Sequence, residues 1–301
     1  MTRGHTIFLL LILLGGAFIV FTLYKQKSKA PLGMSFSPVF QLIGKSTRST
    51  DIALTRMLPI DQMDEKDYGE AIAKEYLLQT DTKDKNYIYL NELIKEVSKF
   101  SKKKFNYQVF IVSSPVANAY ALPGGVICVT EGLLSTMTTE AQIISILSHE
   151  MGHIERGHCF DAIKFELALK KINSGTTGQL ADIAINCFLR HSFSKTQEND
   201  ADEYGYDLLV LTQYDPMGCS EAFKQLQKQE FISRQSTIVS DYLDTHPPLP
   251  LRIEKSGQNA IQWWEEHHGE KRYVGHKNLI DRISMSQQAY EFEWKSDGLT
   301  L

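Results

Sequence analysis

A His-Glu-x-x-His motif at positions 149–153 has the residue types and the spacing for metal-assisted hydrolysis. On an α-helix, side chains at i and i+4 project from one face, about one turn apart. His149 and His153 can therefore point ring nitrogens at a single zinc ion. Glu150 stands beside the first ligand, where its carboxylate can accept a proton from water that the metal activates. Such a site produces a nucleophile that cleaves peptide bonds at neutral pH.

The residues before the motif indicate a buried helix. Positions 140–148 carry apolar side chains on most helical faces. Thr138 or Thr139 can cap the helix start, and Gln142 completes a capping box if Thr139 is the cap. Glycine inside a helix costs about 0.5–1 kcal/mol relative to alanine, so we expect a neighbouring backbone to approach Gly152 closely. Two histidines and a glutamate on a buried helix need partners, and a metal is the simplest one.

The third ligand must come from elsewhere, because a catalytic zinc takes three protein ligands and leaves one position open. His158 follows His153 by five residues, about 140° around a continued helix, so we expect it to face elsewhere. Glu198 is the better candidate, since it shares a face with Asp202 on a helix that Ser194 can cap. Asp202 would accept a hydrogen bond from a ligating imidazole and fix its tautomer. From spacing alone other carboxylates stay open, because acidic first turns are common.

Four segments, in order along the chain, carry a family resemblance. They are Asn-Ala-Tyr-Ala-Leu-Pro-Gly-Gly at 118–125, His-Glu-x-x-His at 149–153, Glu-Asn-Asp-Ala-Asp at 198–202, and Thr-His-Pro-Pro at 245–248 followed by Arg252. Together they resemble the gluzincin family of membrane-linked zinc endopeptidases that includes the CAAX prenyl protease, HtpX and BepA. The resemblance covers about residues 36–255. It implies one zinc ion per chain, with Glu198 as the third ligand.

The resemblance also implies a fold. We expect an α+β, mainly helical protein, with a zincin-like catalytic core and a small antiparallel sheet beside the motif helix. The residue pattern predicts strands at 106–112 and 126–130, with a short strand at 118–121 between them. In such proteases an extended peptide aligns against the sheet edge through main-chain hydrogen bonds. That role would fall to Asn118, Ala119, Tyr120 and Ala121. The alternative is a plain core hairpin.

The downstream segment offers three open roles. His246 or Arg252 can donate a hydrogen bond to the oxyanion that develops during peptide hydrolysis. His246 can instead fill the open zinc position and hold the enzyme latent. The third alternative is that residues 245–248 form only a rigid turn before a helix.

Length and composition allow one good core with appendages, at 301 residues and 43% hydrophobic side chains. We divide the chain into an N-terminal anchor or signal segment (1–30), a helical lead-in (31–85), a zinc peptidase core (86–255) and a C-terminal helical tail (256–301). The net charge of −4 implies no general affinity for nucleic acid. The four cysteines form no Cys-x-x-Cys pair, and they either make two disulfides or stay buried as free thiols.

An uncharged apolar run of 18 residues, Ile7 to Tyr24, lies near the N-terminus. It is close to the minimum for a membrane span and lacks a clear cleavage site. We therefore favour an uncleaved membrane anchor over a cleaved signal peptide or a buried helix. Three lysines follow directly, opposite Arg3 and the amino terminus, so charge does not settle the orientation.

These features lead to one expected function and one alternative. The expected function is a zinc-dependent endopeptidase that cleaves misfolded or membrane-associated proteins of a bacterial envelope, anchored or exported to face the periplasm. The alternative is a chaperone-like assembly factor with a latent zinc site. Processing of CAAX proteins is disfavoured, because that enzyme's chamber needs several spans and this chain has one apolar segment. The oligomeric state stays open.

Overall fold

The computed structural model describes residues 62–163, 193–235, 246 and 249–296. The chain divides into two compact units, and every described residue belongs to the second, Leu54–Leu301. The apolar run near the N-terminus and most of the 31–85 lead-in lie outside the described residues. None of the described helices combines the length and the apolarity needed to cross a membrane.

Two helices lead into the core. Helix α4 (Gln62–Gln79) packs on the turn η1 (Pro123–Gly125), where a Cβ on Gly69 would lie only 2.5 Å from the Cα of Gly124. Helix α5 (Lys85–Ser98) begins where Asp84 accepts hydrogen bonds from two backbone N–H groups of its first turn. The buried side of α5 carries apolar residues at helical spacing, Tyr89, Leu90, Leu93, Ile94 and Val97.

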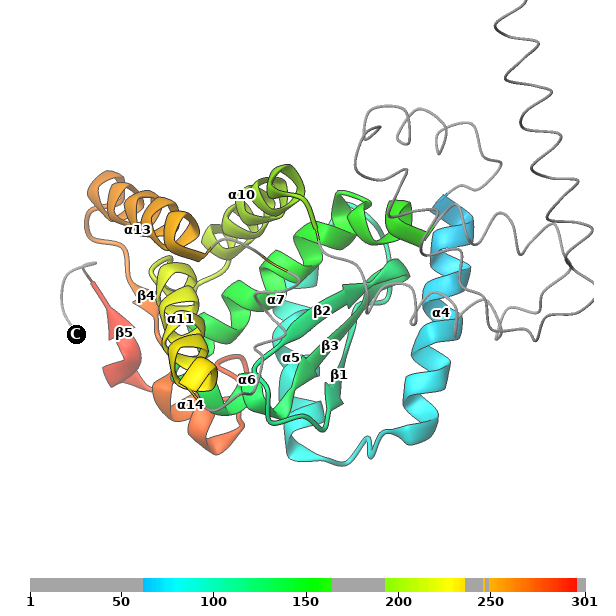
Figure 1. The fold of residues 1–301 in the computed structure, drawn as a ribbon. Helices are drawn as coiled ribbons and strands as arrows, with labels where there is room; N and C mark the ends of the chain where they lie inside the picture. Colours follow the sequence, from blue (N-terminus) through cyan, green and yellow to red (C-terminus); the bar gives the residue numbers. More distant parts are fainter. Residues whose placement is uncertain (1–61, 164–192, 236–245, 247–248, 297–301) are drawn as a thin grey trace, which may run out of the picture. The chain divides into compact units, whose positions relative to one another are not determined.

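The main sheet has three strands in the order β1-β3-β2 (Figure 1). Their bounds are Gln108–Val112 (β1), Ala119–Leu122 (β2) and Val126–Thr130 (β3). All three predicted strands are confirmed, but the predicted antiparallel sheet is wrong, because β1 pairs with β3 in parallel. The β2–β3 hairpin reverses the chain, and β1 then joins the far side of β3. The sheet is therefore mixed, and the fully buried β3 is its centre.

The motif helix is α7 (Glu140–Glu155), which packs between β2 on one side and α11 on the other (Figure 1). Every side chain from 140 to 154 is buried, which confirms the prediction of a buried helix. Thr139 caps it by accepting a hydrogen bond from the N–H of Gln142. The side chain of Gln142 reaches back to the N–H of Thr138 rather than to that of the cap residue, so the capping box is shifted by one residue.

Helix α10 (Lys195–Leu211) crosses α7 at very short range. A Cβ added to Gly152 would lie 2.7 Å from the carbonyl oxygen of Ala201, which confirms the predicted close approach of a backbone. On α10 the reciprocal contact is made by Gly205, where a Cβ would lie 2.8 Å from the Cα of His149. Ser194 caps α10, as predicted, and it also forms a full capping box with Gln197. Small residues on both helices therefore bring α10 within reach of the motif histidines.

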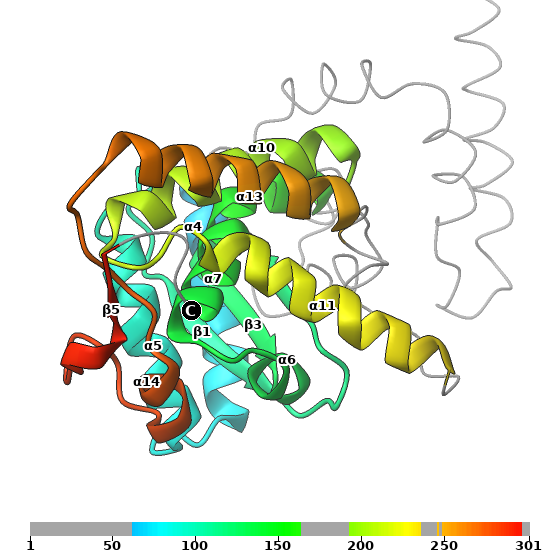
Figure 2. The ribbon, with the colours of Figure 1, turned by 90° about the vertical axis from the view of Figure 1, so that its left-hand side faces the viewer.

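The remaining elements follow α10. Helices α11 (Gly218–Gln235) and α13 (Leu249–Glu266) pack side by side, and α11 also packs on α7 (Figure 2). The C-terminal stretch adds more than the predicted helix, because it also contains a two-stranded ribbon. The ribbon consists of β4 (Arg272–Tyr273) and β5 (Trp294–Lys295), and between these strands lie the helices α14 (His276–Asp281) and η2 (Glu291–Glu293).

The three cysteines in the described part of the chain, Cys128, Cys159 and Cys219, are buried free thiols. Burial raises the pKa of the Cys128 thiol to about 12, so it stays protonated and behaves as a small apolar side chain. Cys187 lies outside the described residues.

Candidate metal centre

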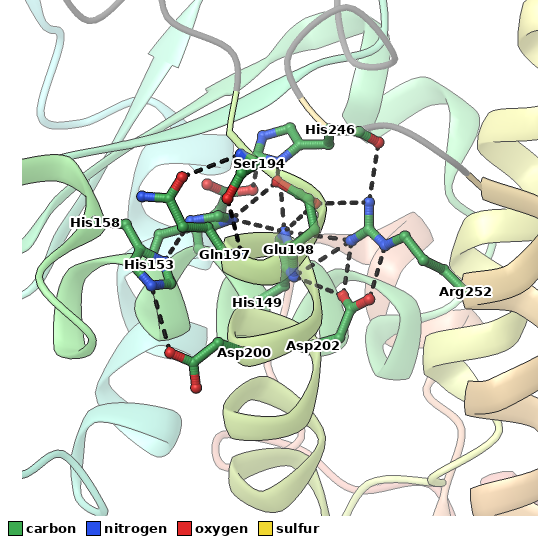
Figure 3. Close-up of polar contacts among 11 residues, drawn as sticks. His149, His153, His158, Ser194, Gln197, Glu198, Asp200, Asp202, His246 and Arg252 are labelled. Carbon is green, nitrogen blue, oxygen red and sulfur yellow. Dashed lines mark hydrogen bonds and ion pairs between the residues drawn. The ribbon is translucent and has the colours of Figure 1, made fainter. Parts of the chain in front are cut away.

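Four buried side chains from three parts of the chain converge on one point (Figure 3). Helix α7 supplies His149 and His153, α10 supplies Glu198, and the segment just before α13 supplies His246. One nitrogen or oxygen atom of each lies within 4.8 Å of the corresponding atom of every other. The structure thus brings together the three predicted metal ligands and adds His246.

The spacing of these atoms fits a small metal ion. The Nε2 atoms of His149 and His153 are 3.2 Å apart, and Nε2 of His153 is 3.4 Å from Oε1 of Glu198. His246 Nδ1 lies 2.9 Å from the same oxygen and 3.5 Å from Nε2 of His149. Tetrahedral zinc with bonds of about 2.0–2.1 Å places its ligand atoms about 3.3 Å apart. The donor set, imidazoles plus a carboxylate, is also one that zinc prefers.

The charge of the site favours a divalent cation. Counted in their ionised forms, the carboxylates of Glu150, Glu198 and Asp202 outnumber the guanidinium of Arg252 by two charges, and by one charge when His246 is protonated. Uncompensated charge inside a protein is costly, so a buried pocket of this kind needs a counter-ion. A bound divalent metal would balance it.

Glu150 stands out because neither oxygen of its buried carboxylate has a hydrogen-bond partner among the described residues. Buried carboxylates in folded proteins are normally satisfied by hydrogen bonds or ion pairs. Nε2 of His246 lies 3.8 Å from Oε1 of Glu150. A carboxylate held beside the metal ligands without a hydrogen bond from the described residues is positioned to act on something the protein binds there.

His149 is oriented from behind by a carboxylate. Its Nδ1 lies 2.9 Å from Oδ1 of Asp202, while its Nε2 faces the other ligand atoms. An N–H at Nδ1 that donates to this carboxylate leaves the lone pair on Nε2 for a metal. The structure therefore places Asp202 where the i, i+4 spacing with Glu198 predicts it.

Arg252 joins the two acidic residues of α10 to the His246 segment. Its Nε and Nη2 donate to both carboxylate oxygens of Asp202, at 2.9 and 2.8 Å. Its Nη1 lies 3.0 Å from Oε2 of Glu198 and donates to the backbone carbonyl of His246 at 3.1 Å. The guanidinium also lies over the ring of Phe223, 4.2 Å from its centre. Through these contacts the guanidinium of Arg252 holds the ligands in position.

His158 is not among the converging ligands, in line with the expected direction away from the site, but its contact with a motif histidine was not expected. Its Nδ1 lies 3.1 Å from Nδ1 of His153. The expectation assumed a continuous helix, whereas α7 ends at Glu155. Gly157 then takes a positive φ of 78°, a conformation that glycine adopts readily, and the chain turns back. His158 is still absent from the group of converging ligands.

Phe193 is a site residue that sequence reasoning missed. Its ring stacks on His153 with a centre-to-centre distance of 3.8 Å and an interplanar angle of 21°. It also lies 5.6 Å from the ring of His246. Phe193 directly precedes the cap of α10, so its place follows from the helix start, but its contact with His153 is tertiary and leaves no local sequence signal.

The electrostatics of the site keep two of its ligands, Glu198 and His153, in metal-binding form. Burial alone would raise the pKa of Glu198, but His246 and His153 outweigh it and hold that pKa well below its usual range. Burial would likewise raise the pKa of Asp202, but Arg252 and a histidine bring it down to about 2. Burial lowers the pKa of His153 well below its ordinary value. The carboxylates are therefore ionised and this imidazole neutral near pH 7.

The predicted substrate strand lies at the edge of the sheet beside the motif helix. Strand β2 pairs only with β3 in the described sheet and packs on α7 (Figure 1). Asn118 precedes it, with its backbone hydrogen-bonded to Thr130 at the end of β3. The side-chain Oδ1 of Asn118 is buried and has no hydrogen-bond partner in the described structure.

A buried His-Glu-x-x-His helix with a glutamate from a second helix completing the ligand set, beside a small sheet, defines a metallopeptidase with a zincin-like core. The family profile described as "Peptidase family M48" matches residues 85–258, more than half of the chain. The chain belongs to peptidase family M48.

Curated relatives agree with this assignment. The mitochondrial metalloendopeptidase OMA1 of Arabidopsis thaliana is 30% identical over 160 residues, which are 52% of this chain and 32% of the relative. The metalloprotease LoiP of Escherichia coli K12 is 31% identical over 147 residues, 46% of this chain and 57% of the relative. The beta-barrel assembly-enhancing protease of the same strain is 24% identical over 191 residues, 58% and 39%. The chain thus spans between about a third and just over half of these relatives.

Proposed function

We propose that this metallopeptidase is a zinc-dependent endopeptidase whose catalytic base is Glu150. The observation that carries the proposal is the buried carboxylate of Glu150, which accepts no hydrogen bond from the described residues and lies beside the converging atoms of His149, His153 and Glu198. In a metallopeptidase these three residues would hold the metal. A zinc ion there supplies Lewis acidity, which polarises a carbonyl group and lowers the pKa of water.

Separate side chains of the protein then transfer the proton and hold the ligands in position. Glu150 accepts the proton of the attacking water and passes it to the nitrogen of the leaving amine, because its oxygens accept no hydrogen bond from the described residues. Asp202 holds the proton of His149 at Nδ1 and so keeps the opposite nitrogen available as a ligand. Arg252 forms an ion pair with Oε2 of Glu198, which leaves Oε1 directed at the histidines.

Substrate binding is proposed for the edge of the sheet. Strand β2 is an edge strand and packs on the motif helix, so an extended peptide added there would run past the metal ligands. Asn118, Ala119, Tyr120 and Ala121 are the residues assigned to this role. Main-chain hydrogen bonds would hold the peptide with little regard to its sequence, which suits a protease acting on unfolded segments.

His246 supports a second candidate function. Its Nδ1 lies 2.9 Å from Oε1 of Glu198, and His246 belongs to the group of converging ligands, so it would occupy the position that a catalytic metal leaves open. Such an arrangement describes a latent protease. A chaperone-like assembly factor that cuts rarely is therefore the alternative function, and release of His246 from the site would separate the two states.

The proposed substrates are misfolded or membrane-associated proteins of a bacterial envelope. Support comes from the name of one relative, the beta-barrel assembly-enhancing protease of Escherichia coli, and from the apolar run near the N-terminus. Membrane anchoring and a periplasm-facing location belong to the same proposal.

A protein-degradation assay with casein tests the proposed activity directly. The purified full-length chain should degrade casein, lose that activity when a chelator removes the metal, and regain it when zinc is restored. Absence of cleavage in every condition would favour the assembly factor. Cleavage that survives metal removal would contradict the metalloprotease mechanism.

A further inference from the structure

His158 contacts the metal ligand His153 on the side opposite the other ligands. The Nε2 atom of His153 faces the site, 3.2 Å from His149, whereas its Nδ1 atom faces His158 at 3.1 Å. His153 is fully buried and His158 is 7% exposed. This contact is thus shielded from water, and each ring nitrogen in it needs a protein partner.

The backbone brings His158 back to His153 through a specific turn. The chain leaves α7 after Glu155, reverses at Gly157 with its φ of 78°, and resumes helical structure from 158 to 163. A Cβ at Gly157 would meet nothing within 4 Å, so glycine serves the conformation of the turn here and not close packing. The turn places the imidazole of His158 directly behind its neighbour.

The positions of the nitrogens determine where the protons must be. For His153 to ligate a metal through Nε2, its proton must sit on Nδ1. That N–H points at Nδ1 of His158, which must therefore accept. The proton of His158 then sits on its Nε2, and Oδ2 of Asp200 lies 3.4 Å away to accept it. If Nδ1 of His158 donated to Nδ1 of His153 instead, the proton of His153 would sit on its Nε2 and block metal ligation.

Asp200 completes this chain from α10, the same helix that supplies Glu198 and Asp202 (Figure 3). Its other oxygen pairs with Nε of Arg156 at 3.1 Å, which holds the carboxylate in place. The side chain of Asp200 is 40% exposed, so its hold on His158 is weaker than a buried contact. Asp202 supports His149 directly, whereas Asp200 would support His153 through an intervening imidazole.

We propose that His158 is a positioning residue of the metal centre, which fixes the tautomer and ring orientation of His153 and is itself oriented by Asp200. The inference rests on the proposed function, since it assumes that His153 ligates a metal. The arrangement favours positioning over space filling, because a carboxylate at Asp200 can only accept from Nε2–H of His158 and so leaves Nδ1 of His158 to accept from His153. Loss of such outer partners typically weakens metal binding by about 10–100-fold.

The test compares two substitutions of His158 in the full-length chain. His158→Phe keeps a ring but removes the acceptor, whereas His158→Asn places an amide oxygen near the position of Nδ1. Zinc affinity is measured by competition with a chelator, and the rate of zinc release is measured alongside. His158→Phe should bind zinc about 10–100-fold more weakly, and His158→Asn should recover most of that loss. His268→Phe, at an exposed histidine, is the matched control and should bind zinc like the wild type.

The outcomes separate this inference from the proposed function. A wild-type chain that binds no zinc would defeat the proposed function itself. If the wild type binds zinc and His158→Phe binds it equally tightly, or if His158→Asn is no better than His158→Phe, the positioning role is overturned. Should His158→Phe fail to fold, Asp200→Ala removes a half-exposed side chain instead, and an affinity unchanged from the wild type would overturn the role.

Discussion

At the scale of single residues, the centre depends on groups that hold the ligands as much as on the ligands. Arg252 contacts Asp202 through two hydrogen bonds and also reaches Glu198 and the backbone of His246. A planar guanidinium can make all of these contacts together because its five N–H groups point in fixed directions. We therefore assign Arg252 to ligand positioning in preference to oxyanion stabilisation.

Replacing Arg252 with lysine tests that assignment. Arg252→Lys keeps the positive charge but loses the two-point contact with Asp202, so zinc affinity should fall by about 10–100-fold. Chelator competition measures it. The control is Arg282→Lys, at an arginine that bonds Asn86, and it should bind zinc normally. Wild-type affinity in Arg252→Lys, with a large loss of turnover alone, would return Arg252 to the role of oxyanion donor.

His246→Ala distinguishes latency from catalysis. A hydrogen bond to a charged group contributes about 1.5–3 kcal/mol, so losing the contact with Glu198 should open the site and raise casein cleavage roughly tenfold or more. Initial rates at equal zinc occupancy measure the effect. A fall in rate would instead identify His246 as a donor to the transition state, and an unchanged rate would leave it a structural residue.

At the scale of elements, the site depends on how closely α7 and α10 approach. Gly152 and Gly205 remove the side chains that would separate the two backbones. Each of the two helices supplies one of the ligands, His149 on α7 and Glu198 on α10. Any increase in the helix separation therefore moves Glu198 away from the histidines.

Gly152→Ala should disturb both stability and metal binding. The new Cβ would lie 2.7 Å from the carbonyl oxygen of Ala201, and overpacking of this kind costs about 1–3 kcal/mol. Urea unfolding and chelator competition measure the two effects. Gly257→Ala, whose Cβ would meet only Ser220 at 3.8 Å, is the matched helical control and should be neutral or slightly stabilising. Equal zinc affinity in both variants would show that the helix approach does not control the site.

At the scale of the whole molecule, the C-terminal stretch is tied to the start of the motif helix. The carbonyls of Gly275 and Val274 accept the N–H groups of Glu140 and Ala141. The carboxylate of Glu140 accepts from Tyr214 and from the backbone of Met285. Residues far apart in sequence therefore meet at one buried carboxyl group.

This junction gives stability a predictable dependence on pH. Burial raises the pKa of Glu140 to about 8 from the ordinary 4.5, although hydrogen bonds from Tyr214 and Met285 oppose the shift. The folded state thus holds a proton that the unfolded state releases between about pH 4.5 and 8. The stabilising contribution is complete below pH 4.5 and is lost as pH rises through about 8.

Glu140→Gln removes the titrating group and should cancel that part of the dependence. Urea unfolding of the metal-free protein at pH 5, 7 and 9 measures the free energy of unfolding for the wild type and the variant. The difference in the free energy of unfolding, variant minus wild type, should increase with pH over this range. A difference that stays constant from pH 5 to 9 would contradict the raised pKa.

The sequence predicted what local signals and the family resemblance specify. Strand β3 and helix α10 match their predicted positions, because a run of β-branched residues and the Ser194 cap are read from neighbouring residues. Glu198 was predicted as the third ligand from the family motif at residues 198–202. The parallel direction of β1 was missed, because its pairing with β3 depends on distant residues. The contact of His158 with His153 was missed, although Gly157, a glycine just past the last helical turn, is a recognised stop signal.

The most direct measurement combines metal analysis with cleavage of casein by the wild type and the Glu150→Gln variant. Both proteins should hold one zinc ion per chain, since Glu150 is not a ligand, and the variant should cleave about 10²–10⁴-fold more slowly. Glu198→Ala should lose the metal. Wild-type cleavage by Glu150→Gln, or a wild-type chain that binds no metal, would contradict the mechanism.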